Sequence, residues 1–482
     1  MSSETVDVLI VGAGLSGIGA ACHLQRNCPD RQVAILEARA NLGGTWDLFR
    51  YPGIRSDSDM YTLGYSFKPW VGEKAIADGP SILQYLRDTA AEYGVDQHIR
   101  FGHRVLRADW STADTLWTVE IERAAGEVFT MRCNFLLMCS GYYRFEAGYT
   151  PDFAGIESFA GRVVHPQQWP QQIKLQGQRV VVIGSGATAV TLVPELAKLG
   201  ATVTMLQRSP TYMVSRPSID GMARWLLRTL GPRVAHGLAR WKNVLYGQFV
   251  FKLARKRPAA VKRRLINMLS AQLPTGYDVK THFTPHFKPW DQRICLVPDG
   301  DLFKSIKDQT VQIVTDQIER FTPSGILLKS GAELPADVVV TATGLQVQLS
   351  SAMSMRIDGE LIDFSKRVGY KGMMFGGVPN FAQVFGYTNA SWTLKADLVC
   401  EFVCRMLNHM RSHKLRQCMP LPPNPAMPLL PWIDFSSGYL QRVMDSLPKQ
   451  GAEKPWKLNQ SYFKDLLWLR YGSLHDGVMH FS

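Results

Sequence analysis

The amino-acid sequence predicts an α/β protein with two doubly wound domains, each built around a parallel sheet. Two glycine-rich turns predict this fold, one beginning at Gly12 and one at Gly184, because each lies between a short apolar run and a helical run. The length of 482 residues gives room for roughly three domain-sized units, and an apolar content of 46% is typical of a chain with a large core.

The first turn follows an apolar run over 6–11 and precedes a helical run over 18–25. Its glycines allow a tight turn and let a pyrophosphate approach the free N–H groups at the helix start. The next strand, predicted over 33–37, ends in an acid whose carboxylate accepts hydrogen bonds from a ribose diol and repels a 2′-phosphate. The pattern predicts a site for FAD or NAD at Gly12, Gly14, Ser16, Gly17 and Glu37.

The second turn follows a strand predicted over 179–183 and precedes a helix that reaches Leu199. The next strand, predicted over 201–206, is followed by an arginine where NAD binding calls for an acid, and an arginine favours a 2′-phosphate. A solvated arginine without a ligand is the alternative interpretation. The pattern predicts an NADPH site at Gly184, Ser185, Gly186, Ala187, Thr188, Arg208 and Ser209.

Two irregular segments carry further polar and aromatic groups. Diglycine and Tyr-Pro-Gly sequences make 43–57 an ordered loop, either a surface Ω-loop or part of a cofactor site. Segment 159–170 lies between the two turns and contains two prolines and a glycine, so we expect a stiff connector that couples the two domains. A surface linker with packed aromatic residues is the alternative.

Both segments resemble motifs of the type I Baeyer–Villiger monooxygenases. Segment 159–170 fills that family's fingerprint with Phe159, Gly161, His165, Trp169 and Pro170. Segment 43–57 fills a second motif with Gly44, Trp46, Tyr51, Pro52, Gly53 and Asp57, and Ala342-Thr343-Gly344 matches a third. The runs 43–61 and 386–397 look closest to the mycobacterial, ethionamide-activating members of the family.

The resemblance implies that the second domain is inserted into the first. Residues 1–145 and 336–482 would form an FAD-binding domain, and residues 146–335 an NADPH-binding domain with a helical insert over 216–280. FAD would lie along Gly44, Thr45, Trp46 and Asp57, with its adenine near the backbone of Val105. Arg293 would be the active-site arginine, positioned by Asp57, and the neighbouring Gln292 replaces a lysine that helps many members to bind the 2′-phosphate.

The reaction implied by the resemblance is insertion of one oxygen atom from O₂ into a ketone, through a C4a-peroxyflavin, to give an ester or lactone. Oxygenation of sulfur in thioethers or thioamides is expected as well. An arginine suits this chemistry because it is permanently charged and has several donors for the developing negative charge. The alternative is an N- or S-oxygenating flavin monooxygenase, in which the position of Trp169 usually carries Tyr or Phe.

The positive charge of the chain leaves a second question open. The formal net charge is +13, and residues 221–265 contain twelve Lys or Arg and no Asp or Glu, interleaved with Trp225 and Trp241. Either this insert roofs the substrate pocket with a solvated basic face, as we favour, or it lies on an anionic membrane or another acidic surface. Nucleic acid is not expected as a partner.

The cysteines and the chain start predict the compartment. The eight cysteines have no metal-binding spacing, so we expect no metal site and reduced core cysteines in a cytoplasmic protein. Residues 1–7 lack the basic stretch of a signal peptide, and no apolar run approaches the roughly 18 residues of a membrane span.

Overall fold

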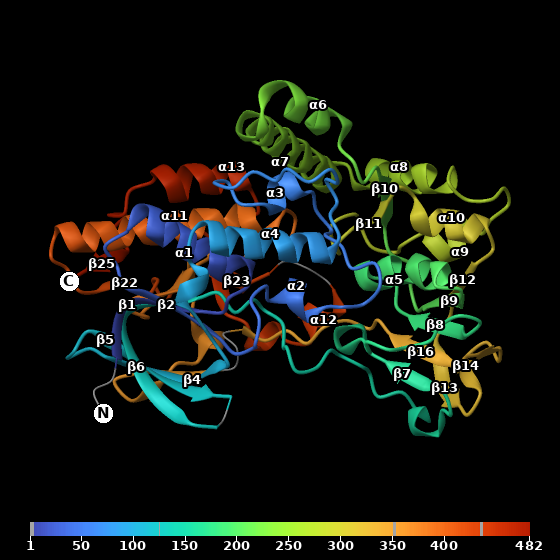
Figure 1. Cartoon of the computed structure of the whole chain (residues 1–482), viewed down its shortest axis with the longest axis horizontal. Coiled ribbons are helices and arrows are strands. Elements are labelled where there is room, and N and C mark those ends of the chain that lie inside the picture. Colours follow the sequence, from blue (N-terminus) through green and yellow to red (C-terminus); the bar gives the residue numbers. More distant parts are fainter. Residues whose placement is uncertain (1–3, 125, 350–352, 434–436) are drawn as a thin grey trace.

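The structure is a computed structural model that describes residues 4–124, 126–349, 353–433 and 437–482. Residues 1–3, part of the chain start considered above, lie outside this range. Two α/β units lie side by side in Figure 1, the first coloured blue to cyan and orange to red, the second green to light orange. Segments from both ends of the chain therefore build the first unit, and the second is inserted between them.

The first unit is built on a mixed sheet with the strand order β18-β17-β4-β5-β6-β1-β2-β3, in which β21 also pairs with β6. The central strands β1, β2 and β6 run parallel and end at a common edge, where Val11 lies beside Leu36 and Met138. The Gly12 turn follows at this edge, the usual ligand side of such sheets. The bounds are β1 (Glu4–Val11), β2 (Val33–Glu37), β3 (Ile99–Phe101), β4 (His103–Ser111), β5 (Leu116–Arg123), β6 (Val128–Met138), β17 (Ser354–Ile357), β18 (Glu360–Leu361) and β21 (Phe381–Gln383).

Helices from both ends of the chain cover this sheet together. Helix α1 packs against α4 and α11, so the helix that begins at the Gly12 turn rests on a helix from the C-terminal part. The main helices and the C-terminal elements are α1 (Leu15–Asn27), α2 (Thr45–Leu48), α3 (Met60–Leu63), α4 (Gly79–Glu92), α11 (Trp392–Ser412), α12 (Gly438–Gln441), α13 (Tyr462–Asp465), β19 (Gly369–Tyr370), β20 (Met374–Phe375), β22 (Cys418–Pro420), β23 (Leu429–Pro431), β24 (Lys449–Gly451) and β25 (Met479–Phe481).

The second unit is built on a parallel sheet with the order β12-β9-β8-β16-β7. Strand β16 pairs with both β8 and β7, and its four residues are buried. The expected domain boundary at residue 335 is therefore too early, because this apolar strand completes the second sheet before the chain returns. The bounds are β7 (Arg162–Val164), β8 (Arg179–Ile183), β9 (Thr202–Gln207), β10 (Met213–Arg216), β11 (Cys295–Pro298), β12 (Val311–Thr315), β13 (Ile318–Thr322), β14 (Gly325–Leu328), β15 (Glu333–Pro335), β16 (Val338–Thr341), α5 (Ala187–Lys198), α9 (Val279–Phe283) and α10 (Asp301–Lys307).

The helical insert consists of α6 (Gly221–Leu230), α7 (Pro232–Lys256) and α8 (Pro258–Ser270). It bridges the two units, since α7 packs against α3 of the first unit and α8 packs against β10 of the second. Figure 1 shows α6 and α7 standing above the body of the molecule. No helix in the described part of the chain is long and apolar enough to span a membrane.

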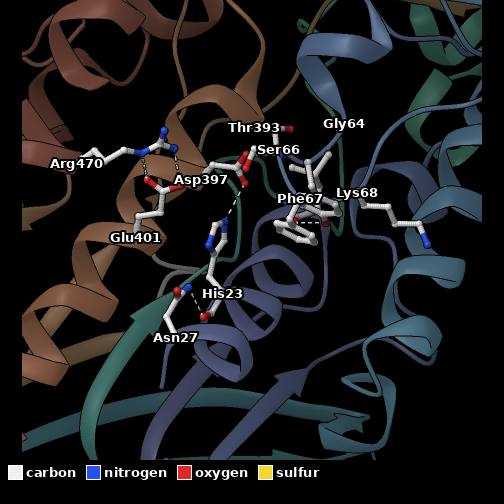
Figure 2. Close-up of polar contacts among 12 residues, drawn as sticks. His23, Asn27, Gly64, Ser66, Phe67, Lys68, Thr393, Asp397, Glu401 and Arg470 are labelled. Carbon is white, nitrogen blue, oxygen red and sulfur yellow. Dashed lines mark hydrogen bonds and ion pairs between the residues drawn. The ribbon is translucent and has the colours of Figure 1, made fainter. Parts of the chain in front are cut away.

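A buried ionic network fixes the insert to the first unit. Arg240 on α7 donates to the carbonyl oxygen of Gly64 at 2.7 Å, and its Nη2 lies 3.2 Å from Oδ2 of Asp397. The same carboxylate accepts a hydrogen bond from the Ser66 amide at 2.9 Å and lies 3.1 Å from His23 Nε2 (Figure 2). Burial raises the pKa of Asp397, but the hydrogen bond and charge of His23 and the charge of Arg240 outweigh this and keep the pKa below its usual value.

Candidate active site

One cavity of about 1310 Å³ brings the two glycine turns together. It is lined by residues of both units, including the loop 43–57, the turn at Gly184 and the segment that holds Arg293. The predicted site residues that line it are Gly12, Gly14, Ser16, Glu37, Gly44, Thr45, Trp46, Asp57, Val105, Gly184, Ser185, Gly186, Ala187, Thr188, Arg208, Ser209 and Arg293. Their roles toward a cofactor remain predictions.

Gly17 is the predicted cofactor residue that does not line this cavity. A Cβ atom at Gly17 would lie 1.8 Å from the carbonyl oxygen of Gly12, so the glycine lets the first turn of α1 pack directly under the loop. Gly12 has φ +102°, and a Cβ there would meet the carbonyl oxygen of Cys139 at 2.8 Å. Neither glycine has room for a side chain, so both are needed for the close packing of the turn. Gly12, Gly14 and Ser16 of this turn line the cavity.

Glu37 lies at the end of β2, beside the first turn. Its carboxylate accepts hydrogen bonds from the amides of Ala13 at 2.8 Å and Arg39 at 3.0 Å. Burial raises the pKa of Glu37 above its ordinary value. Each carboxylate oxygen has a second lone pair, so Glu37 can still accept hydrogen bonds from a ribose that enters the cavity.

The loop 43–57 is fastened to the first unit by a buried ionic contact. Arg39 donates to the carbonyl oxygen of Gly44 at 3.1 Å and pairs with the buried carboxylate of Asp47 at 2.7 Å. Asp47 also pairs with Arg50 at 2.5 Å. The loop is therefore part of the cavity wall and not a separate surface Ω-loop. Arg39 and Asp47 were not predicted as site residues. The only indication in the sequence is that a basic and an acidic residue lie on either side of the diglycine at 43–44.

Arg293 and Asp57 form an ion pair that faces the cavity. Their side chains are 37% and 42% exposed, and this exposure is to the cavity that both residues line. The negative charge of Asp57 raises the pKa of Arg293 well above its usual value, with smaller contributions from neighbouring tyrosines, while burial works against it. The guanidinium is therefore a fixed cation between the two glycine turns.

An aromatic wall adjoins this cation and was not predicted from the sequence. The indole of Trp392 donates to Oγ of Ser16 at 2.8 Å and stacks on Tyr142 with ring centres 5.2 Å apart. The hydroxyls of Tyr142 and Tyr143 are hydrogen-bonded to each other. All four residues line the cavity. The wall therefore joins the Gly12 turn to the neighbourhood of Arg293.

The second turn presents an open backbone. Gly184 has φ +137°, and a Cβ there would lie 2.4 Å from the carbonyl oxygen of Ala342, so the third motif packs against this turn. A Cβ at Gly186 would meet no atom within 4 Å. The hydroxyl of Ser185 donates to the carbonyl oxygen of Ser209 at 3.0 Å, which ties the turn to the end of β9. A phosphate can therefore approach the start of α5.

The fingerprint residues lie outside the cavity. They contact the two chain segments that connect the units, residues 142–149 and 344–348. These connecting segments run antiparallel, with the amide of Arg144 bonded to the carbonyl of Gln346 at 2.8 Å. His165 Nδ1 accepts from the Gln167 amide at 3.1 Å, so Nε2 carries the proton and donates to the Gly344 carbonyl at 3.2 Å. The Gln167 side chain donates to the carbonyls of Arg144 and Phe145 at 2.8 and 2.9 Å.

The other fingerprint residues support this contact by packing. A Cβ at Gly161 would lie 2.5 Å from the carbonyl oxygen of Asp337, so the glycine lets β7 enter beside β16. Phe159 is buried against Phe321, and Trp169 packs against the core of the second unit. The segment therefore contacts both connecting segments, and its role in coupling the two units stays a prediction.

The helical insert does not form a roof over this cavity. Within the described chain, no residue of 216–280 lines it. The interpretation favoured from the sequence was wrong because α7 packs on α3 and is held there by Arg240. The exposed face of the insert is thus free of the substrate pocket.

Comparisons with known proteins agree with this architecture. A profile described as flavin-binding monooxygenase-like matches residues 75–351, and one for NAD(P)-binding Rossmann-like domains matches residues 10–70. The chain is 53% identical over 481 residues to the FAD-containing monooxygenase EthA of Mycobacterium tuberculosis. This alignment covers 100% of this chain and 98% of that protein. The chain is 52% identical, with the same coverage, to EthA of Mycolicibacterium smegmatis.

The solved structure of oxidized steroid monooxygenase bound to NADP has the same fold. It superposes with a TM-score of 0.74 at 22% identity and covers 87% of this chain and 88% of that one. The full-length similarity and the family profile confirm the resemblance seen in the sequence motifs. The chain therefore belongs to the flavin-binding monooxygenase-like family.

Proposed function

We propose that this chain is an FAD-dependent, NADPH-consuming monooxygenase of the Baeyer–Villiger type. It inserts one oxygen atom from O₂ into ketones to give esters or lactones, and also oxygenates sulfur in thioethers or thioamides. The observation that carries this proposal is the Arg293–Asp57 pair in the same cavity as the two glycine turns. The relatives named FAD-containing monooxygenases and the steroid monooxygenase bound to NADP support the choice of cofactors.

The residues of the cavity fit the two cofactors. Glu37 offers lone pairs to a ribose beside the Gly12 turn. Arg208 directly follows β9, the strand that comes after the Gly184 turn and its helix α5. Bound FAD would activate O₂, and NADPH would supply the two electrons that the reaction consumes. The chain would hold both molecules in this cavity, which Arg293 lines as well.

Arg293 would act on the substrate oxygen. A guanidinium fixed by Asp57 needs no reorganisation when negative charge develops on that oxygen, and such a fixed donor is worth about 100- to 1000-fold in rate. The wall of Tyr142, Tyr143 and Trp392 would exclude water from the reacting groups, since these large side chains pack against one another and line the cavity.

The cofactor assignment is tested by direct analysis of the purified protein. We expect it to release FAD on denaturation, and NADPH to bleach the flavin absorbance in the absence of O₂. A protein that holds FAD but is reduced by neither NADPH nor NADH would contradict the proposal. The alternative, an enzyme that oxygenates only nitrogen or sulfur, differs in its products and is separated from the proposal by product analysis.

We also propose that this cytoplasmic enzyme binds anionic membranes through the helical insert. The exposed apolar residues of α7 are spaced three or four positions apart and form one stripe: Val234, Leu238, Trp241, Leu245 and Phe249. Trp225 on α6 is 61% exposed. Between 221 and 265 the chain has twelve Lys or Arg and no acid. An apolar stripe with basic residues around it fits the headgroup region of an anionic bilayer.

Vesicle sedimentation tests this second proposal. We expect the protein to sediment with vesicles of phosphatidylglycerol and phosphatidylcholine at low salt, and the double variant Trp225→Ser, Phe249→Ser to stay in the supernatant. Tyr471→Ser is the matched control, because Tyr471 is 69% exposed outside the insert. Equal sedimentation of the wild type and the double variant would contradict an apolar docking face.

A further inference from the structure

The cations that line the cavity divide into those with a partner and those without. Among the described residues, Arg39, Arg55, Arg104 and Arg293 pair with Asp47, Asp301, Glu122 and Asp57, and Arg442 lies 3.5 Å over the ring of Tyr149. Arg208 and Lys329 line the same cavity, are exposed, and have no such partner in the described chain. Long basic side chains left unpaired in a ligand cavity indicate an anionic ligand group.

The two unpaired cations come from neighbouring backbone. Arg208 directly follows β9, and the carbonyl of Gln207 at the end of that strand accepts from the amide of Asp316 at 3.0 Å. One residue further, the carbonyl of Gln317 accepts from the amide of Lys329 at 2.9 Å. A ladder of two backbone hydrogen bonds therefore joins the two positions across three chain segments, at the cavity edge of the second unit.

The remaining charged and polar groups at this edge leave a net positive charge. Asp316 lines the cavity too, but hydrogen bonds from the Ser330 hydroxyl and the Gln317 amide engage its carboxylate and lower its pKa, although burial works in the opposite direction. Gln292, which lines the same cavity, is neutral. The two positive charges of Arg208 and Lys329 therefore exceed the one negative charge of Asp316. A phosphomonoester, with a charge of about −1.5 to −2 at pH 7, matches this surplus.

We propose that Lys329 and Arg208 together bind the 2′-phosphate of NADPH, which makes Lys329 a second residue that determines the preference for NADPH over NADH. The proposal rests on the NADPH-binding function of the Gly184 turn. Arg208 can bind the phosphate through two parallel N–H groups, and Lys329 supplies a mobile point charge from the turn after β14. The site combines one donor that fixes orientation with one that adds charge.

The test uses the FAD-loaded enzyme and two nucleotide probes. Adenosine 2′,5′-bisphosphate carries the phosphate in question, and adenosine 5′-monophosphate lacks it. We expect Lys329→Gln to weaken binding of the bisphosphate about 10- to 100-fold, the factor given by one charge-assisted hydrogen bond, and to leave binding of the monophosphate unchanged. Lys329→Arg should keep most of the affinity, and Lys307→Gln, an exposed lysine outside the cavity, should behave as wild type.

Steady-state kinetics give the second readout. Lys329→Gln should raise the Michaelis constant for NADPH and leave that for NADH unchanged. A wild type that prefers NADPH, with Lys329→Gln unaltered in both assays, would overturn the role of Lys329 and leave the proposed function standing. A wild type that binds neither probe and is reduced by neither cofactor would overturn both. A melting temperature of Lys329→Gln equal to wild type will show that the exposed substitution leaves the fold intact.

Discussion

Asp57 and Arg293 lie 236 positions apart in the sequence, yet the carboxylate of one binds the guanidinium of the other inside the cavity. Asp57 comes from a loop of the first unit, and Arg293 precedes β11 of the second. The pair therefore joins the two units at the place where both glycine turns meet. This relationship has a direct kinetic consequence.

Replacing Arg293 should separate cofactor reduction from oxygen transfer. We expect Arg293→Ala to retain reduction of the flavin by NADPH and to lose ester formation by about 100- to 1000-fold, because the fixed donor at the developing oxyanion is gone. Stopped-flow absorbance measures the first step and product analysis the second. A variant with wild-type ester yield would remove Arg293 from the chemistry.

Replacing Gln167 should slow turnover without removing any group from the cavity. Gln167→Ala loses two hydrogen bonds to the connecting segment, so the two units are held less well in register. A misplacement of about 1 Å can cost up to about 100-fold, and we expect kcat to fall about tenfold in a variant that stays folded, with a melting temperature lowered by the two lost hydrogen bonds. Gln171→Ala is the control, because Gln171 is exposed directly after the same segment. Equal kcat values for the two variants would contradict the coupling role.

Replacing Asp397 should destabilise the fold. Asp397→Ala leaves Arg240 buried without its countercharge and His23 without its partner, and the loss of one member of a buried pair costs about 3 to 5 kcal/mol. Thermal unfolding measures the effect. Asp30→Ala is the control, since Asp30 pairs with Arg411 at the exposed surface and should change the melting temperature little. Similar shifts for both variants would contradict the anchoring role of Asp397.

Acid should weaken the docking of the insert through His236. Burial, helped by the charge of Arg240, lowers the pKa of His236 to about 4, while its Nδ1 accepts from the Trp70 amide at 3.2 Å. The unfolded chain takes up the proton near pH 6.5 and the folded chain does not, so stability falls as the pH drops from about 6.5 toward 4. The full loss is about 3 kcal/mol, since each pKa unit is worth about 1.4 kcal/mol.

The melting temperature as a function of pH checks this effect. Between pH 7 and pH 5, wild type should lose more stability than His236→Gln, which has no titrating ring. Parallel curves for the two proteins would show that His236 does not report on docking. The pH range of the effect distinguishes it from that of the paired carboxylates, which also lose stability on acidification but only at lower pH.

The parts of the fold that follow local patterns were predictable. Both glycine turns, Glu37 and Arg208 lie where the strand and helix patterns place them, because a turn of this kind is a short-range structure. The end of the second unit was misplaced because β16 is an apolar strand that could complete either sheet, and only its pairing with β7 and β8 decides this.

The parts of the site that depend on long-range packing were not predictable. Trp392 reaches Ser16 across 376 positions, and Arg39 acts through a loop whose charge pattern has no known signature. Lys329 has no motif around it and lines the cavity because the chain returns after β14 to Gln317, next to the residue that bonds to Gln207 at the end of β9. Arg293 was identified through family resemblance, since its own segment carries little signal.

The most direct test of the central claim is product analysis by mass spectrometry. The FAD-loaded enzyme would receive NADPH, isotopically labelled O₂ and a straight-chain ketone, with a thioether in a parallel reaction. We predict an ester that contains one labelled oxygen atom, together with a labelled sulfoxide from the thioether. A labelled sulfoxide without any ester would contradict the Baeyer–Villiger assignment and place the enzyme among the oxygenases of nitrogen and sulfur.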